Sequence, residues 1–148
     1  MTDNQPKKPD LYRDTLVRYL GYANEVGESF KSLIPKSAYL STYAISIAYV
    51  SADTLDKSEN LKKKLTAADV FIWQMLASVI VPGFTINRIC HFSRLGLMRS
   101  STSFRNYKYN KYIVSGIGLG SIPLIVKPID HSIDYVMDES FRKYVGKE

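Results

Sequence analysis

Three stretches of the chain contain no charged residue, and they restrict the possible folds more than any other feature. They cover residues 37–52, 70–87 and 112–126. A helix that crosses a bilayer needs roughly 20 mostly apolar residues, within a range of about 17 to 25, so the second stretch is long enough and the other two are short. Lys36, Lys111 and Lys127 stand at the ends of the short stretches, where their long side chains would reach the membrane interface. We therefore predict three membrane-spanning helices, with a soluble bundle of buried helices as the alternative.

Two further segments have the apolar spacing of amphipathic helices. Apolar side chains recur three and four positions apart over residues 10–34, before Pro35, and again over residues 130–145, after Pro128. Each helix would either pack into a protein core or lie on a membrane surface. The prediction is an all-α multipass membrane protein with about three transmembrane helices plus amphipathic N-terminal and C-terminal helices. Residues 1–9 would be a disordered tail, and residues 10–148 a single helical membrane domain.

The titratable residues of the chain exclude several kinds of site. A single cysteine, Cys90, cannot form an internal disulfide, and with only two histidines we expect no metal site. No nucleophile, base and orienting group occur in a known pattern, and no glycine-rich phosphate loop follows a strand, so we expect no enzymatic activity, no catalytic residue and no cofactor. The first ten residues resemble neither a secretory signal nor an Arg-rich presequence, so import into an organelle would use internal information.

A basic segment lies between the second and third uncharged stretches. Residues 88–111 contain six basic and no acidic residues, in a chain whose formal net charge is +6. Cations interleaved with aromatic residues are typical of single-strand nucleic-acid binding, but the apolar stretches on both sides favour a loop that binds anionic lipid headgroups. We therefore expect a membrane partner and no nucleic acid. The candidate lipid-binding residues are Arg88, Arg94, Arg99, Arg105, Lys108 and Lys111.

Small residues and prolines mark positions within the uncharged stretches. Small side chains that recur every four residues let helices approach closely, within one chain or in a homo-oligomer. The candidate packing residues are Ala44, Ala48, Ala52, Gly116 and Gly120. Pro82, Gly83 and Pro123 predict a kink or a break in their helices. Gln74 and Asn87 are polar residues within or near the second stretch, and we expect Gln74 to hydrogen-bond a neighbouring helix.

Four segments together are similar to one known family. They are DLYRDTLVRYLGYANEVGESFKSLIP, AYVSADTLDK, DVFIWQMLASVIVPGFTINRIC and IPLIVKPIDHSIDYVMDESFRK. They resemble the mitochondrial fission process protein family, also called the mitochondrial 18 kDa protein, over residues 10–56, 69–90 and 122–143. The linkers 57–68 and 91–111 do not match the family pattern.

This resemblance implies a non-enzymatic multipass protein of the mitochondrial inner membrane. Such a protein would be involved in mitochondrial division and in the morphology or integrity of that membrane. Its anionic lipid would be cardiolipin, and its partners other inner-membrane proteins or a larger complex. Two other functions remain open, namely a structural accessory subunit of a respiratory or ATP-synthesising complex, and a small solute carrier or channel subunit.

Overall fold

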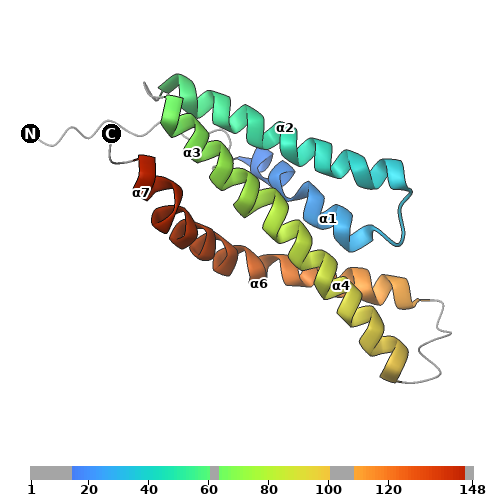
Figure 1. The fold of residues 1–148 in the computed structure, drawn as a ribbon. Coiled ribbons are helices and arrows are strands. Elements are labelled where there is room, and N and C mark those ends of the chain that lie inside the picture. The colour runs from blue at the N-terminus through green and yellow to red at the C-terminus, as the bar shows by residue number, and fades with distance from the viewer. Residues whose placement is uncertain (1–14, 61–63, 101–108, 146–148) are drawn as a thin grey trace, which may run out of the picture.

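The fold is a bundle of helices. The computed structural model describes residues 15–60, 64–100 and 109–145, and within these ranges it contains helices and turns but no strand (Figure 1). The helices are η1 (Leu16–Tyr22, 3-10), α1 (Ala23–Phe30), α2 (Lys36–Asn60), α3 (Lys64–Gln74), η2 (Met75–Ile80, π), α4 (Val81–Ser100), α6 (Asn110–Glu139) and α7 (Phe141–Val145). The predicted tail at residues 1–9 lies outside the described residues.

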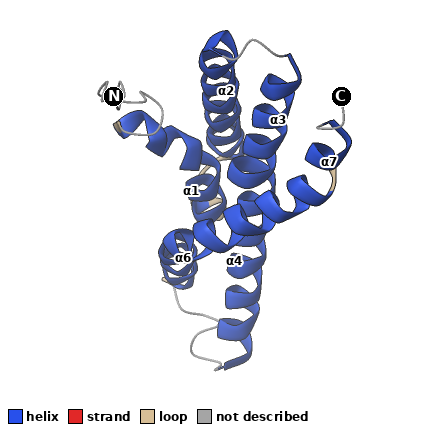
Figure 2. Cartoon of the chain, turned by 90° about the vertical axis from the view of Figure 1, so that its left-hand side faces the viewer, coloured by secondary structure: helices blue, strands red, loops and turns tan. Residues whose placement is uncertain are grey.

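Helix α1 lies in the middle of the bundle and contacts α2, α4 and α6 (Figure 2). The Thr15 side chain caps η1 by accepting a hydrogen bond from the Val17 amide at 3.2 Å. A short turn at Pro35 then separates α1 from α2, and the Pro35 carbonyl accepts the Tyr39 amide at 3.0 Å. The segment predicted as one helix over residues 10–34 is therefore described as a 3-10 helix followed by a short α-helix.

Helices α3, η2 and α4 form one continuous helical rod. A π turn over Met75–Ile80 ends two residues before Pro82, and the Val81 amide that caps it donates to the Leu76 carbonyl. Proline has no amide hydrogen and its ring disturbs the preceding turn, so a local change of helix type accommodates it. The helix is thus distorted at the predicted position but not broken. Gly83 has a packing role instead, because a Cβ there would lie 2.9 Å from the Tyr43 hydroxyl.

Helix α6 continues through both of its prolines, Pro123 and Pro128. The predicted boundary between a span at residues 112–126 and a separate helix at 130–145 is therefore wrong. The helical backbone turns only at Ser140, between α6 and α7. Figure 1 shows α6 curving along its length, as expected for a helix whose interior prolines remove two backbone hydrogen bonds.

Among the described residues, two helices are long and apolar enough to be candidates for crossing a membrane. They cover residues 67–100 and 110–143, each 34 residues long. They contain the predicted spans at 70–87 and 112–126, whereas the predicted span at 37–52 is not supported by this criterion. That segment lies in α2, where serines and tyrosines interrupt the apolar residues and Asp53 follows directly. Of the three expected spans, two are therefore candidates in the structure and the third is not.

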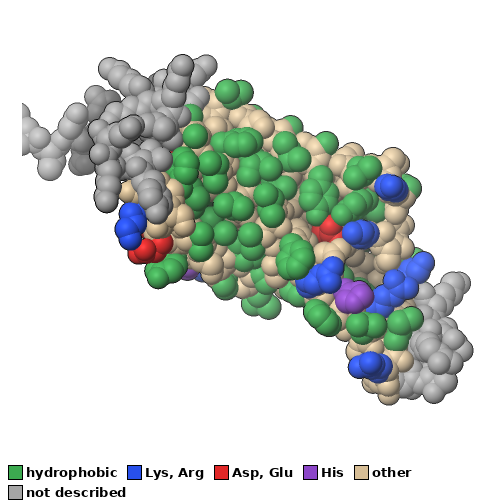
Figure 3. Space-filling model, in the orientation of Figure 1, with side chains coloured by type: hydrophobic (Ala, Val, Ile, Leu, Met, Phe, Trp, Pro, Cys, Tyr) green, Lys and Arg blue, Asp and Glu red, His purple; other side chains and the backbone are tan. Residues whose placement is uncertain are grey.

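Many large apolar side chains of the described residues lie on the surface of the molecule. The one buried apolar cluster of the described residues consists of Ala77, Ile129, Ile133 and Met137, where η2 meets α6. Leu16 and Leu124 are instead 81% and 75% exposed. Hydrophobic side chains cover the middle of the molecule in Figure 3, and charged side chains gather toward the two ends. This surface matches the solvent properties of a lipid bilayer.

Candidate functional site

The face of α1 that points into the bundle is polar. Asn24, Glu25, Glu28 and Ser29 are all buried, whereas Val26 is exposed. An amphipathic helix was expected here, and its apolar side faces outward. The polar side of α1 is therefore the side that packs against the other helices.

Hydrogen bonds join α1 to α2 and to η2. The Asn24 backbone amide donates to the Ser46 hydroxyl oxygen at 3.0 Å, and the Ser46 hydroxyl is 2.9 Å from Asn24 Oδ1. Asn24 Nδ2 donates to the Val79 carbonyl at 3.0 Å. Asn24 and Ser46 are both completely buried, so these bonds satisfy polar atoms that have no access to solvent.

Glu28 is the centre of the polar interior. Tyr39 and Tyr43 of α2 donate to its Oε1 at 2.5 and 2.6 Å, and Asn87 of α4 donates to its Oε2 at 2.7 Å. The Lys31 ammonium lies 3.5 Å from Oε2. Burial would by itself raise the pKa of Glu28, but these donors and Lys31 outweigh it and hold the pKa below its usual value. Glu28 is therefore a charged junction between three helices.

A second carboxylate connects α2 to α3. Asp53 is buried and accepts hydrogen bonds from Gln74 Nε2 and, at 2.6 Å, from the Lys57 ammonium. The prediction that Gln74 bonds a neighbouring helix is therefore confirmed. Asn87, the other polar residue singled out in the sequence, also bonds across helices, to Glu28.

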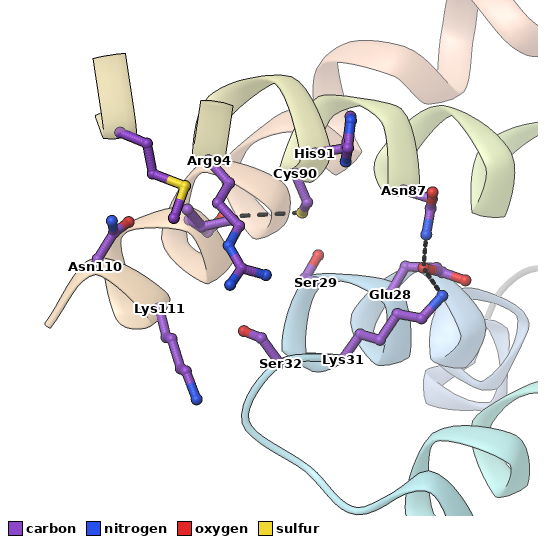
Figure 4. A pocket seen from close by; sticks show the side chains of 12 residues that line it. Glu28, Ser29, Lys31, Ser32, Asn87, Cys90, His91, Arg94, Asn110 and Lys111 are labelled. Carbon is purple, nitrogen blue, oxygen red and sulfur yellow. Dashed lines mark hydrogen bonds and ion pairs between the residues drawn. The ribbon is translucent and has the colours of Figure 1, made fainter. Parts of the chain in front are cut away.

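A basic cavity of about 480 Å³ opens beside Glu28, at the end of the bundle where α1 ends and α6 begins (Figure 4). Lys31, Arg94 and Lys111 line it, and Glu28 is its only carboxylate among the described residues. Bonding to Tyr39 and attraction to Glu28 outweigh the effect of burial and raise the pKa of Lys31, so its ammonium is charged at neutral pH. A cavity with this excess of cations can bind an anion.

The predicted lipid-binding residues are only partly brought together. Arg94 and Lys111 line the cavity. Arg88 instead lies over the Phe84 ring, 5.3 Å from its centroid, and Arg99 is exposed near the end of α4 without lining the cavity. Arg105 and Lys108 lie outside the described residues. Residues 88–100, predicted as part of a loop, are helical and extend α4.

The predicted small-residue packing positions do not pack within the chain. A Cβ at Gly116 or Gly120 would have no neighbour within 4 Å among the described residues, and Ala44 and Ala48 are exposed. Ala52 is half-buried. The close approach occurs at Gly118, where a Cβ would lie 2.7 Å from both Cys90 Sγ and Ser29 Oγ. The positions at Gly116 and Gly120 remain open for a second chain or for lipid.

Lys31 and Glu28 were missed as site residues because their local sequence gives an ordinary signal. A Glu and a Lys three positions apart on a helix usually form a solvated surface pair. One signal in the sequence would have identified Lys31 and Glu28. Both lie on the polar side of a helix in a chain with apolar helices, and polar groups in such a chain favour contact with protein.

Comparison with known proteins gives a consistent result. A family model described as mitochondrial 18 kDa protein (MTP18) matches residues 12–66 and 54–137. Mitochondrial fission process protein 1 of Homo sapiens is 42% identical over 164 aligned positions, covering 99% of this chain and 98% of the relative. The proteins of the same name from Danio rerio and Caenorhabditis elegans are each 43% identical and cover 95% and 92% of this chain, and 92% and 89% of their own length. No solved structure matches the chain.

Proposed function

The chain belongs to the mitochondrial 18 kDa protein family, and from this membership we propose that it is a non-enzymatic multipass protein of the mitochondrial inner membrane that takes part in mitochondrial fission. The relatives at 42–43% identity carry the name mitochondrial fission process protein 1. In this proposal the protein also maintains the morphology or integrity of the inner membrane. It acts as a membrane-embedded body and carries out no reaction.

One observation carries the membrane part of the proposal. The protein itself buries only 33% and 22% of the apolar windows in its two candidate spans. A core helix of a soluble protein would bury most of such a window, because exposing it to water costs about 25 cal/mol per Å² of apolar surface. Lipid removes that cost, and it also explains why the polar side chains of α1 face inward.

The fission part is tested by replacement in human cells. Cells that lack their own mitochondrial fission process protein 1 would receive this chain, and the lengths of their mitochondria would be measured. If the chain supports division, the elongated mitochondria should shorten toward the length measured in cells that keep their own mitochondrial fission process protein 1. Mitochondria that stay elongated despite expression of the chain in the inner membrane would contradict the proposal.

Membrane residence is tested separately by extraction of these mitochondria with alkaline carbonate. Two helices in hydrocarbon are not released when electrostatic contacts are broken, so the chain should stay in the membrane pellet. Recovery of the chain in the supernatant, together with soluble matrix proteins, would exclude the spans.

A second candidate function is a structural accessory subunit of a large inner-membrane complex. The specific observation in its favour is the open surface around Gly116 and Gly120 on α6. Small residues of this spacing allow close approach of another helix. If a complex forms there, replacing both glycines by leucine would shift the chain to a lower apparent mass on a native gel. An unchanged position would remove this support.

A further inference from the structure

The basic cavity has cations on two sides that form no ion pair with another described residue. Figure 4 shows the Arg94 guanidinium from α4 projecting into the space between Ser29 of α1, Ser32 of the turn that follows α1, and Lys111 of α6. Within the described part of the chain, neither Arg94 nor Lys111 forms an ion pair or a side-chain hydrogen bond. Arg94 and Lys111 therefore bring two positive charges to the same cavity.

The carboxylate in the cavity does not offset these charges. Glu28 already accepts bonds from Tyr39, Tyr43 and Asn87, and it pairs with Lys31. The ion pair of Glu28 with Lys31 is locally neutral, so the charges of Arg94 and Lys111 remain. The first residues of α6, Asn110 and Lys111, also line the cavity, and the positive end of a helix dipole adds to the attraction for an anion.

We propose that this cavity binds the phosphate headgroup of an anionic phospholipid. Guanidinium and ammonium groups are the usual protein partners of phosphate oxygens, and a Ser32 hydroxyl provides a further donor. The cavity volume of about 480 Å³ accommodates a glycerophosphate group. The inference stands on the cavity alone and does not depend on a role in fission.

The position of the cavity favours a lipid over a free phosphate ion. It lies between two helices that are candidate membrane spans, near the charged end of the apolar surface. Met98 lines the cavity and is 40% exposed, and Leu95, which follows Arg94 and precedes Met98 by three residues on α4, is 42% exposed. These side chains provide apolar surface for acyl chains beside the cationic site, as in basic pockets between membrane helices that bind lipid headgroups.

The experiment uses the full chain purified in an uncharged detergent and freed of lipid. Native mass spectrometry would measure binding of a diphosphatidyl lipid, of phosphatidylcholine and of inorganic phosphate. We expect the anionic lipid to bind and phosphatidylcholine to bind weakly. The double variant Arg94→Gln with Lys111→Gln should lower the affinity for the anionic lipid by about tenfold or more, because each cation near a phosphate contributes about 1 kcal/mol.

The matched control is Arg88→Gln with Arg99→Gln. It removes the same number of positive charges, here both from α4, but neither residue lines the cavity. Its affinity should change by less than about threefold, because remote exposed charges are screened. An equal loss in both variants would overturn the proposal, since attraction to the general positive charge of the protein would then explain the binding.

Two further measurements complete the test. The charge-preserving variant Arg94→Lys with Lys111→Arg should keep most of the affinity, and if it binds as weakly as the glutamine variant, cationic recognition in the cavity is excluded. Inorganic phosphate should not displace the lipid at comparable concentrations. If it does, the site recognises free phosphate and the lipid proposal is overturned.

Discussion

The side-chain amide of Asn87 on α4 donates to the carboxylate of Glu28 on α1 at 2.7 Å, across 59 positions of the sequence. Because Tyr39 and Tyr43 bring α2 to the other oxygen of Glu28, one carboxylate connects three helices. Polar groups of this kind hold helices together where apolar contacts with lipid would serve equally well. The bundle is therefore specified by its interior polar bonds more than by an apolar core.

The variant Glu28→Gln should destabilise the fold. An amide nitrogen at the Oε2 position would face the amide of Asn87, so two donors would meet and the bond would be lost. We expect the free energy of unfolding to fall by about 1–3 kcal/mol, the usual range for a buried polar group left without its partner. Thermal unfolding in detergent, followed by circular dichroism, measures this change.

The control for Glu28 is Glu139→Gln. Glu139 pairs with Lys143 at 3.5 Å, and both side chains are more than half exposed, so its loss should change the unfolding free energy by less than about 1 kcal/mol. Acid should also lower the stability of the fold, as Glu28→Gln does. The lowered pKa of Glu28 means that its contribution is present above the ordinary pKa of 4.5 and is lost as the pH falls through the folded pKa. Equal effects of the two variants would exclude a junction at Glu28.

Glu25 should make the stability of the fold depend on pH in the opposite direction. Burial raises the pKa of Glu25 from 4.5 to about 8, because its oxygens have no hydrogen-bond partner among the described residues and Asp130 adds repulsion. The unfolded chain loses this proton at lower pH than the folded protein, so stability should fall as pH rises from about 4.5 to about 8 and then level off. The slope is at most about tenfold in the unfolding equilibrium per pH unit.

The variant Glu25→Gln tests this assignment. It keeps the size of the side chain and removes the ionisation, so the decline of stability between pH 4.5 and pH 8 should become shallower. Chemical unfolding at a series of pH values would show this, with Glu139→Gln as the variant that should retain the original slope. A Glu25→Gln protein with the same pH dependence as the original would contradict a neutral Glu25 in the fold.

The all-helical class of the chain follows from the sequence better than the bounds and the packing of its helices do. Spacing of apolar residues identified the N-terminal helix, but an amphipathic pattern only divides a helix into two faces. Which face contacts protein depends on the surroundings, and here Asn24 and Glu28 point inward. Likewise, the Gly116 and Gly120 spacing indicated a small-residue stripe, whereas Gly118 is the glycine that α4 and α1 approach.

The sequence predicted that the candidate site is basic, but it did not predict which residues form it. The basic run identified Arg94 and Lys111, which share one continuous segment of the sequence. The sequence did not show that this segment is helical up to Ser100, so that its arginines point in different directions. The sequence also did not place Lys31 beside them. Lys31 is separated from Arg94 by 63 positions, and the two residues come together because α1 packs against α4 and α6.

Glycine substitutions on α6 should separate packed from open positions. A Cβ at Gly118 would lie 2.7 Å from Cys90 Sγ and Ser29 Oγ, so Gly118→Ala should lower the unfolding free energy by about 1–3 kcal/mol. Gly116→Ala and Gly120→Ala meet no described atom and should stabilise the helix by up to about 1 kcal/mol. Adding Cys90→Ala to Gly118→Ala should restore part of the loss, and thermal unfolding of all four proteins would reveal it. Equal effects at the three glycines would contradict this packing.

In the inner membrane proposed above, the orientation of the protein should follow its basic residues. Arg94, Arg99 and Lys111 flank the connection between the two candidate spans, at the basic end of the bundle, where α6 begins. Basic residues beside spans favour the side from which they are not translocated, so we expect the basic end in the matrix and α7 in the intermembrane space. In a Cys90→Ser background, an impermeant maleimide should label Ser140→Cys once the outer membrane is opened, and Ser100→Cys only after the inner membrane is opened as well. Both positions are exposed, so the difference reports access across the membrane, and labelling in the reverse order would establish the opposite orientation.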